Sequence, residues 1–171
     1  MLKKTIFSVT IALVGLSGMA NAQSSTGESA GTSSFTSFGL GAAYLTNVDS
    51  KDMSYLVSAG KYFRAVDYAG IRLNTNFAFD VESSSYFSST LLGMQAYFNN
   101  GVASTYGYID FGLGYEYSRI NSNQYGFSMA AGPGVIFFRK ASAQLFIEPT
   151  WQIIFDDGTP QMWGLKIGLN Y

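Results

Sequence analysis

The chain has 171 residues, of which 47% are hydrophobic, 16% aromatic and only 12% charged. This length and composition allow a sizeable core in one domain and exclude a disordered chain. Charged residues usually make up about a quarter of a soluble domain, so a water-exposed surface would be hard to build from this sequence. The absence of cysteine and histidine excludes disulfides, thiolate or histidine metal sites and histidine-based catalysis. The net charge of −1 provides no basic excess for binding nucleic acid.

The first 22 residues have the pattern of a secretory signal peptide. Two lysines lie next to the start, an apolar run covers residues 6–14, and small residues end the segment at Ala20-Asn21-Ala22. A charged start, an apolar centre and a small-residue cleavage site together are typical of such a signal. A membrane-spanning helix would need about 20 apolar residues, whereas serines and glycines interrupt this run. We therefore expect export, cleavage before Gln23, and a flexible lead-in rich in Ser, Gly and Thr over residues 23–34.

From residue 35 to residue 171 the hydrophobic pattern has period two, which predicts a single all-β domain. In the clearest segment Ile71 and Leu73 share one face, and Arg72 lies on the other. Connections rich in Asp, Asn, Ser and Gly separate the segments, as expected for turns between antiparallel strands. The eight predicted strands cover residues 35–46, 53–64, 68–81, 86–98, 104–118, 124–138, 142–155 and 161–171. Strands of about 10–14 residues tilted near 40° rise by roughly 25–35 Å, which matches a bilayer core.

Two prolines lie within predicted strands. Proline has no N–H to donate to a β-ladder and is normally confined to sheet edges and bulges. Pro133 lies between Gly132 and Gly134, so we expect a β-bulge there. The pattern offers no explanation for Pro149.

The two faces of the predicted strands differ in composition. One carries bulky aliphatic and aromatic residues, and the other carries mainly Gly, Ser, Ala, Asn and Gln with a few charges. A soluble periplasmic barrel that carries an apolar ligand would turn its bulky face inward, whereas a membrane barrel turns it toward lipid. Aromatic residues near both ends of the strands favour the membrane barrel, because they predict two interfacial girdles. These residues are Tyr44, Tyr55, Phe79, Tyr115, Tyr117, Tyr125 and Phe155 at one end, and Tyr68, Phe98, Phe137 and Tyr171 at the other.

The export signal, the strand count, the period-two pattern and the C-terminal segment resemble one known family. This is the family of small eight-stranded outer-membrane β-barrels, such as the transmembrane domain of OmpA and OmpX, and the resemblance covers residues 35–171. In that family the barrel assembly machinery reads a last strand that ends in an aromatic residue preceded by alternate apolar residues. The matching positions here are Trp163, Leu165, Ile167, Leu169 and Tyr171, with tyrosine in place of the usual terminal phenylalanine.

The resemblance implies an eight-stranded antiparallel up-and-down transmembrane β-barrel in the outer membrane of a Gram-negative bacterium. Its partners would be outer-membrane lipid, lipopolysaccharide and the barrel assembly machinery, and the protein would be a monomer. Both termini would face the periplasm, and four short loops would face outward, at residues 47–52, 82–85, 119–123 and 156–160. Short loops argue against a large ligand-binding crown, so we expect a structural or surface-interaction role in the cell envelope.

Charged residues on the inward faces are the main candidate site. They are Arg72, Asp80, Asp110, Glu116, Glu148 and Lys166. Four of them, all except Asp80 and Glu116, fall at similar heights, and a hairpin centred near Asp157 places Glu148 opposite Lys166. We predict a structural ion-pair cluster, because an unpaired buried charge costs several kcal/mol. The alternative is a gate in a narrow small-solute channel, although eight strands leave an interior just wide enough to be filled by side chains.

The sequence favours a non-enzymatic protein without a cofactor or metal. Enzymatic outer-membrane barrels depend on a catalytic histidine, which is missing here. A hydrolase that uses Asp110 and Glu116 as a carboxylate pair is left open. Asp156-Asp157-Gly158, together with Glu82, could bind a cation, but these residues are more simply explained as a turn.

Overall fold

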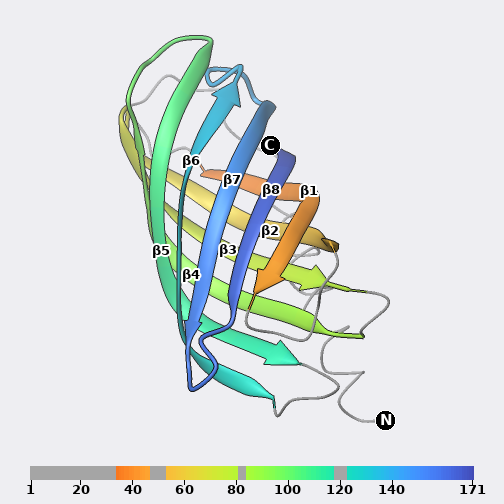
Figure 1. The fold of residues 1–171 in the computed structure, drawn as a ribbon. Coiled ribbons are helices and arrows are strands. Elements are labelled where there is room, and N and C mark those ends of the chain that lie inside the picture. Colours follow the sequence, from red (N-terminus) through yellow and green to blue (C-terminus); the bar gives the residue numbers. More distant parts are fainter. Residues whose placement is uncertain (1–33, 47–52, 81–83, 118–122) are drawn as a thin grey trace. The chain divides into compact units, whose positions relative to one another are not determined.

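The computed structural model describes residues 34–46, 53–80, 84–117 and 123–171. They form a closed barrel of eight antiparallel strands in which each strand pairs with its neighbours in sequence and β8 pairs with β1 (Figure 1). The strands are β1 (Ser34–Thr46), β2 (Met53–Val66), β3 (Ala69–Phe79), β4 (Tyr86–Tyr97), β5 (Ala103–Tyr117), β6 (Gln124–Phe137), β7 (Gln144–Phe155) and β8 (Gln161–Asn170). The predicted fold class is confirmed. The predicted signal peptide and nearly all of the lead-in lie outside the described residues; Ser34 already belongs to β1.

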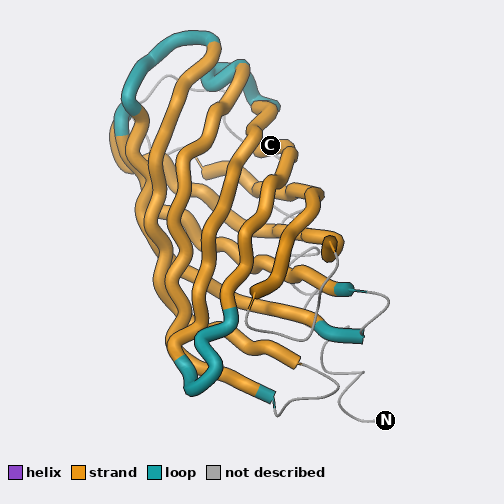
Figure 2. Tube along the Cα trace, in the orientation of Figure 1, coloured by secondary structure: helices purple, strands orange, loops and turns teal. Residues whose placement is uncertain are grey.

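Strands account for most of the described chain, and short connections join them at both ends of the barrel (Figure 2). The described residues contain no helix that is long and apolar enough to cross a membrane. We call the end where β1 begins and β8 finishes the terminal end; the connections β2–β3, β4–β5 and β6–β7 lie there as well. At the other end, three of the four predicted outward loops fall wholly or partly outside the described residues.

The side chains alternate between the two faces of the barrel wall as predicted. On β3, Ile71 is 47% exposed and Leu73 is 44% exposed, whereas Arg72 between them is only 7% exposed. The same inversion recurs on β8, where Leu165 is exposed and Lys166 is buried. An apolar outer surface around a polar interior is the distribution of a transmembrane β-barrel. A soluble carrier would require the opposite arrangement.

Aromatic side chains are exposed at both ends of the barrel. Tyr44, Tyr55, Tyr125 and Phe155 are exposed at the end opposite the termini, and Tyr68, Phe98 and Tyr171 are exposed at the terminal end. Two residues of the first group contact further aromatic rings, with centroids 5.5 Å apart for Tyr55 and Phe79 and 5.9 Å apart for Phe155 and Phe127. The positions fit the two girdles that anchor a barrel at the membrane surfaces.

The interior is more apolar than the sequence analysis expected. Two clusters of buried apolar side chains fill it. One includes Tyr62, Leu91, Tyr97, Tyr106, Tyr108, Ala130, Ile136 and Phe146. The other includes Ala43, Leu45, Leu56, Ala78, Phe87, Ile154 and Met162. Large inward side chains are tolerated because glycines on neighbouring strands make room; a Cβ at Gly134, for example, would collide with the ring of Tyr106.

The expected bulge at Pro133 is wrong. The β6–β7 ladder pairs Ala131 with Trp151 and then Val135 with Ile147, with three residues between the pairs on each strand, so the register does not shift. This register places Pro133 opposite Pro149. The ladder is interrupted only there, between the Ala131–Trp151 pair and the Val135–Ile147 pair. Two residues without an N–H therefore share one gap, which explains Pro149 as well. The register shift that does occur lies between β2 and β3, at Arg64 and Val66.

Candidate functional site

The strand register places four charged side chains in the middle of the lumen. Glu148 on β7 is paired directly with Lys166 on β8, the juxtaposition expected from the β7–β8 hairpin. Arg72 projects inward from β3 and Asp110 from β5, with the small residue Gly93 between them in the register. All four charged residues are buried, and the most exposed of them, Arg72, is only 7% exposed.

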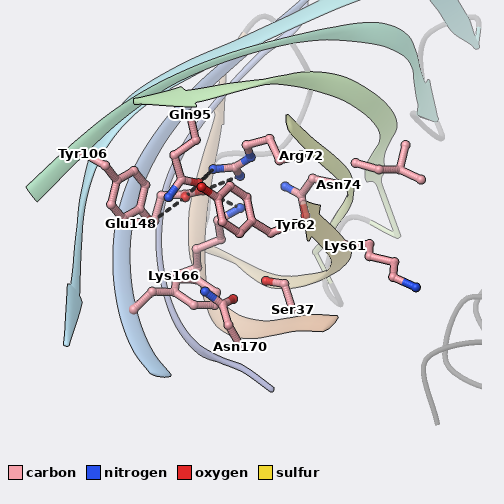
Figure 3. A pocket seen from close by; sticks show the side chains of 12 residues that line it. Ser37, Lys61, Tyr62, Arg72, Asn74, Gln95, Tyr106, Glu148, Lys166 and Asn170 are labelled. Carbon is pink, nitrogen blue, oxygen red and sulfur yellow. Dashed lines mark hydrogen bonds and ion pairs between the residues drawn. The ribbon is translucent and has the colours of Figure 1, made fainter. Parts of the chain in front are cut away.

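Glu148 is the centre of this cluster (Figure 3). Its carboxylate accepts two hydrogen bonds from the Arg72 guanidinium, at 2.7 Å from Nη1 and 3.0 Å from Nη2. The Lys166 Nζ lies 2.8 Å from the Oε1 of Glu148, and the Tyr106 hydroxyl donates to its Oε2 at 2.8 Å. A fork-to-fork arginine–carboxylate pair is among the strongest and most directional polar contacts in proteins. This pair joins β3 to β7 across the lumen.

Asp110 contributes the second negative charge. Its Oδ2 lies 3.1 Å from the Nε of Arg72, and the Arg72 guanidinium also stacks 4.0 Å above the centre of the Tyr108 ring. The close approach requires glycine at position 93, because a Cβ there would collide with the Asp110 carboxylate. With Arg72 and Lys166 positive and Asp110 and Glu148 negative, the cluster as a whole is neutral.

Hydrogen-bonded amides extend the cluster in both directions. Toward the terminal end, the Arg72 Nη1 donates a hydrogen bond to the Gln95 Oε1 at 3.4 Å, and the Gln95 Nε2 donates to the Tyr97 hydroxyl. Toward the other end, Lys166 donates to Asn76, and the Asn76 Nδ2 donates to Gln152 on the opposite wall at 3.1 Å. The lumen is thus crossed at two levels, by Arg72 with Glu148 and by Asn76 with Gln152.

Little free volume remains beside the cluster. A cavity of about 30 Å³ lies on its terminal side, lined by residues that include Tyr62, Gln95 and Asn170 (Figure 3). A single water needs roughly 10–15 Å³ by this measure, so the cavity holds about two water molecules. The described part of the lumen is therefore closed by side chains, as expected for eight strands.

The other predicted inward charges lie away from the cluster. Glu116 is buried on the same strand as Asp110 but six residues further along, which corresponds to about 20 Å. The two carboxyl groups are too far apart for an acid–base pair, which needs about 5–9.5 Å. Asp80 is buried just after the end of β3.

The acidic turn after β7 shows ordinary turn chemistry. Asp156 accepts hydrogen bonds from the backbone N–H groups of Tyr125 and Asp157, and its carbonyl accepts one from Thr159. Its carboxylate thus satisfies backbone donors. Among the described residues there is no group of three or more metal-ligating acidic side chains. Glu82, the proposed partner in a cation site, lies outside the described residues.

The proposed assembly residues of the last strand all lie on the outer face. Trp163, Leu165, Ile167, Leu169 and Tyr171 are each about half exposed. Their placement follows the alternation of β8, in which Met162, Lys166 and Asn170 are buried. The strand therefore presents one continuous apolar and aromatic stripe to its surroundings.

Sequence reasoning missed the tyrosines and amides that complete the cluster. Tyr106 and Tyr108 share the inward parity of Asp110 on β5, so the period-two pattern alone identifies their direction. The partner of the Tyr106 hydroxyl, Glu148, lies on β7, and alternation along one strand gives no information about contacts with a distant strand. Gln95 and Gln152 could be assigned to the lumen by the same parity, but not to a particular partner.

Comparison with known proteins identifies the fold only. No family model and no curated sequence matches the chain. Among solved structures, Neisserial surface protein A (NspA) aligns with a TM-score of 0.70 and 11% identity, over 82% of this chain and 97% of that one. Ail of Yersinia pestis, in complex with the heparin analogue sucrose octasulfate, aligns with a TM-score of 0.52 and 16% identity over 82% and 99%. The outer-membrane enzyme PagL aligns with a TM-score of 0.52 and 10% identity over 80% and 98%. The chain has the fold of small outer-membrane β-barrels, so the family resemblance is confirmed at that level.

Proposed function

We propose that this protein is a non-enzymatic outer-membrane β-barrel with a closed lumen, which serves the cell envelope as a structural or surface-interaction protein. The observation that carries the proposal is the combination of an apolar outer wall with a lumen crossed by Arg72 and Glu148. The first feature requires a bilayer, and the second prevents free passage of solutes. Proteins of this fold include a surface protein and an attachment protein, which is consistent with such a role.

The energetics of the cluster support a permanently closed lumen. Opening a path would separate Arg72 from Glu148 and leave buried charges without partners, and losing one partner of such a pair costs about 3–5 kcal/mol. The cluster is neutral, so it offers no excess charge to attract one class of ion. These properties favour a structural plug over a gate.

The remaining parts of the proposal concern biogenesis and surroundings. Residues 1–22 would direct export, and the outward stripe on β8 from Trp163 to Tyr171 would be the signal for the barrel assembly machinery. The mature protein would be a monomer in contact with lipid and lipopolysaccharide. Deleting Tyr171 should reduce the amount of assembled barrel, as measured by the heat-modifiable band on gels, while Asn170→Ala should not.

The arrangement of the described residues supports the part of the proposal that concerns the lack of enzymatic activity. PagL shows that this fold can host an enzyme. Here histidine is missing from the whole sequence, and Asp110 and Glu116 lie too far apart to act on one bond. Asp110 is also fully buried against Arg72.

Two experiments test the proposal. Cell fractionation, with boiled and unboiled gel samples, should recover the protein in the outer membrane with a boiling-dependent change in mobility. A soluble periplasmic protein without that change would overturn the membrane assignment.

Planar bilayer recordings test closure of the lumen. The wild-type protein should give no conductance steps above a blank membrane. The double variant Arg72→Ala/Glu148→Ala removes the bond across the lumen and leaves Asp110 and Lys166 in balance, so it should conduct small ions. Steps of equal size in the wild type and the double variant would show that the cluster does not close the lumen.

A further inference from the structure

Two arginines lie together at the terminal end of the barrel, beyond the lumen cluster. Arg64 is near the end of β2, and Arg139 follows β6 in the connection to β7. The Arg64 Nη2 donates a hydrogen bond to the backbone carbonyl of Arg139 at 3.1 Å, so the two residues are in contact. Arg139 is only 3% exposed, although its charge is permanent.

The side chains and carbonyls that the two guanidinium groups contact are neutral. The Arg139 guanidinium stacks 3.7 Å above the centre of the Tyr97 ring, and its Nη1 donates to the Asn99 carbonyl and to the Asn100 side chain. The Arg64 guanidinium lies 5.3 Å from the centre of the Phe35 ring. The ion pairs that Arg72 and Lys166 form lie in the lumen cluster, and none between two described residues reaches Arg64 or Arg139.

Both arginines also retain unused donors. The Nε atoms of Arg64 and Arg139 are buried and make no hydrogen bond among the described residues. A buried polar atom without a partner normally indicates a missing ligand or a functional constraint. Arg72 differs, because both of its terminal nitrogens donate to Glu148 and its Nε forms an ion pair with Asp110 at 3.1 Å.

The backbone next to Arg139 is unusual as well. Phe138 has a φ of 59°, the left-handed region that bulky residues rarely adopt. The turn is held by the Phe138 N–H bonded to the Val102 carbonyl, and by the Gln144 side chain, which donates to the Arg139 carbonyl at 2.6 Å. Strained backbone of this kind persists where the surrounding structure imposes it, often beside a binding site.

We propose that Arg64 and Arg139 form a binding site for a phosphate group at the terminal end of the barrel. Two permanently charged guanidinium groups present more N–H donors than the two oxygens of one carboxylate can accept, whereas a phosphate offers oxygens to both. The Tyr62 ring lies between the two aromatic partners of the arginines, with centroids 6.4 Å from Phe35 and 6.2 Å from Tyr97. The phosphate could be free inorganic phosphate or the headgroup of a phospholipid in the adjacent leaflet.

The test uses the protein in dodecyl maltoside micelles, which contain no phosphate. Inorganic phosphate, short-chain phosphatidylglycerol and acetate are titrated separately while the arginine Nε–H resonances are followed by NMR. Saturable shifts of the Arg64 and Arg139 signals with either phosphate-containing probe support the site, and the more effective probe identifies the source. Absence of a saturable shift with both, or equal affinity for acetate, overturns the proposal.

Matched variants distinguish a built site from general cationic attraction. Arg64→Gln and Arg139→Gln should each weaken phosphate binding at least tenfold. Lys61→Gln and Lys140→Gln remove a positive charge at the same end and should leave binding unchanged. Equal weakening in the lysine variants would overturn the proposal. If Arg139→Gln fails to show a heat-modifiable barrel, the test uses Arg64→Gln and Arg64→Lys. Lysine keeps the positive charge but lacks the planar guanidinium, so Arg64→Lys should bind phosphate at least several-fold more weakly than the wild type.

Discussion

The coupling between Lys166 and Glu148 is the sharpest energetic prediction. Lys166→Met removes one cation and changes the cluster from neutral to a net charge of −1, while Arg72 and Tyr106 still hold Glu148. Glu148→Gln keeps the shape and a carbonyl acceptor but leaves a net charge of +1. Each single change should lower the free energy of unfolding by about 3 kcal/mol, because it strands a buried charge. The double variant restores neutrality, so its loss should fall at least about 1.5 kcal/mol short of the sum.

The measurement is urea unfolding of the protein in lipid vesicles. Fluorescence of Trp151 and Trp163, the two tryptophans of the chain, reports the transition, and gel mobility of unboiled samples reports the folded barrel. Lys61→Met is the matched control, because Lys61 packs its ammonium 5.6 Å from the Phe63 ring and belongs to no ion pair in the described ranges. Strict additivity in the double variant, or an equal loss from Lys61→Met, would refute the coupled cluster.

Further predictions test the outer wall, the ladder gap and the glycine contact. Leu165→Arg at the centre of β8 should cost about 2–4 kcal/mol in vesicles if it faces the bilayer midplane, and Leu165→Ile should cost much less; equal unfolding midpoints would contradict the assigned face. Replacing both Pro133 and Pro149 by valine restores two N–H donors to the gap in the β6–β7 ladder. Hydrogen exchange should then show slowly exchanging amides at both positions, whereas rapid exchange at both would show that the gap has another cause. Gly93→Ala should cost about 1–3 kcal/mol because its methyl group overlaps a buried carboxylate, whereas Gly107→Ala meets only a flexible ring; similar unfolding midpoints for the two would argue against the close packing.

The contacts between neighbouring strands and the similar heights of the four inward charges could be predicted from the sequence, but the specific pairs across the lumen could not. Alternation assigns each residue to a face, and a hairpin fixes which residues of adjacent strands are opposite, so Glu148 and Lys166 could be paired in advance. The partnership of Arg72 with Glu148 depends on how far successive strands are staggered around the closed barrel. That stagger is a sum over all strand pairs, and no single turn determines it.

The ladder gap at Pro133 illustrates a second limit. A lone proline in a strand is correctly treated as a bulge candidate. The alternative, in which Pro149 from the next strand shares the same gap, becomes visible only once the register of β6 with β7 is known. Tyr108 then adds a contact from inside the barrel, with its hydroxyl 3.4 Å from the Pro149 carbonyl, which the interrupted ladder leaves accessible.

The same separation between local and distant contacts has a consequence for folding. The Glu148–Lys166 pair lies within one hairpin and can form as soon as β7 and β8 meet. The bonds from Arg72 to Glu148 and from Asn76 to Gln152 each join residues 76 positions apart, so they must wait until the wall has closed. Closing so long a loop costs entropy before any contact compensates for it. The cluster therefore contributes most after closure, when Arg72 and Glu148 meet across the lumen and join the Glu148–Lys166 pair that the hairpin has already formed.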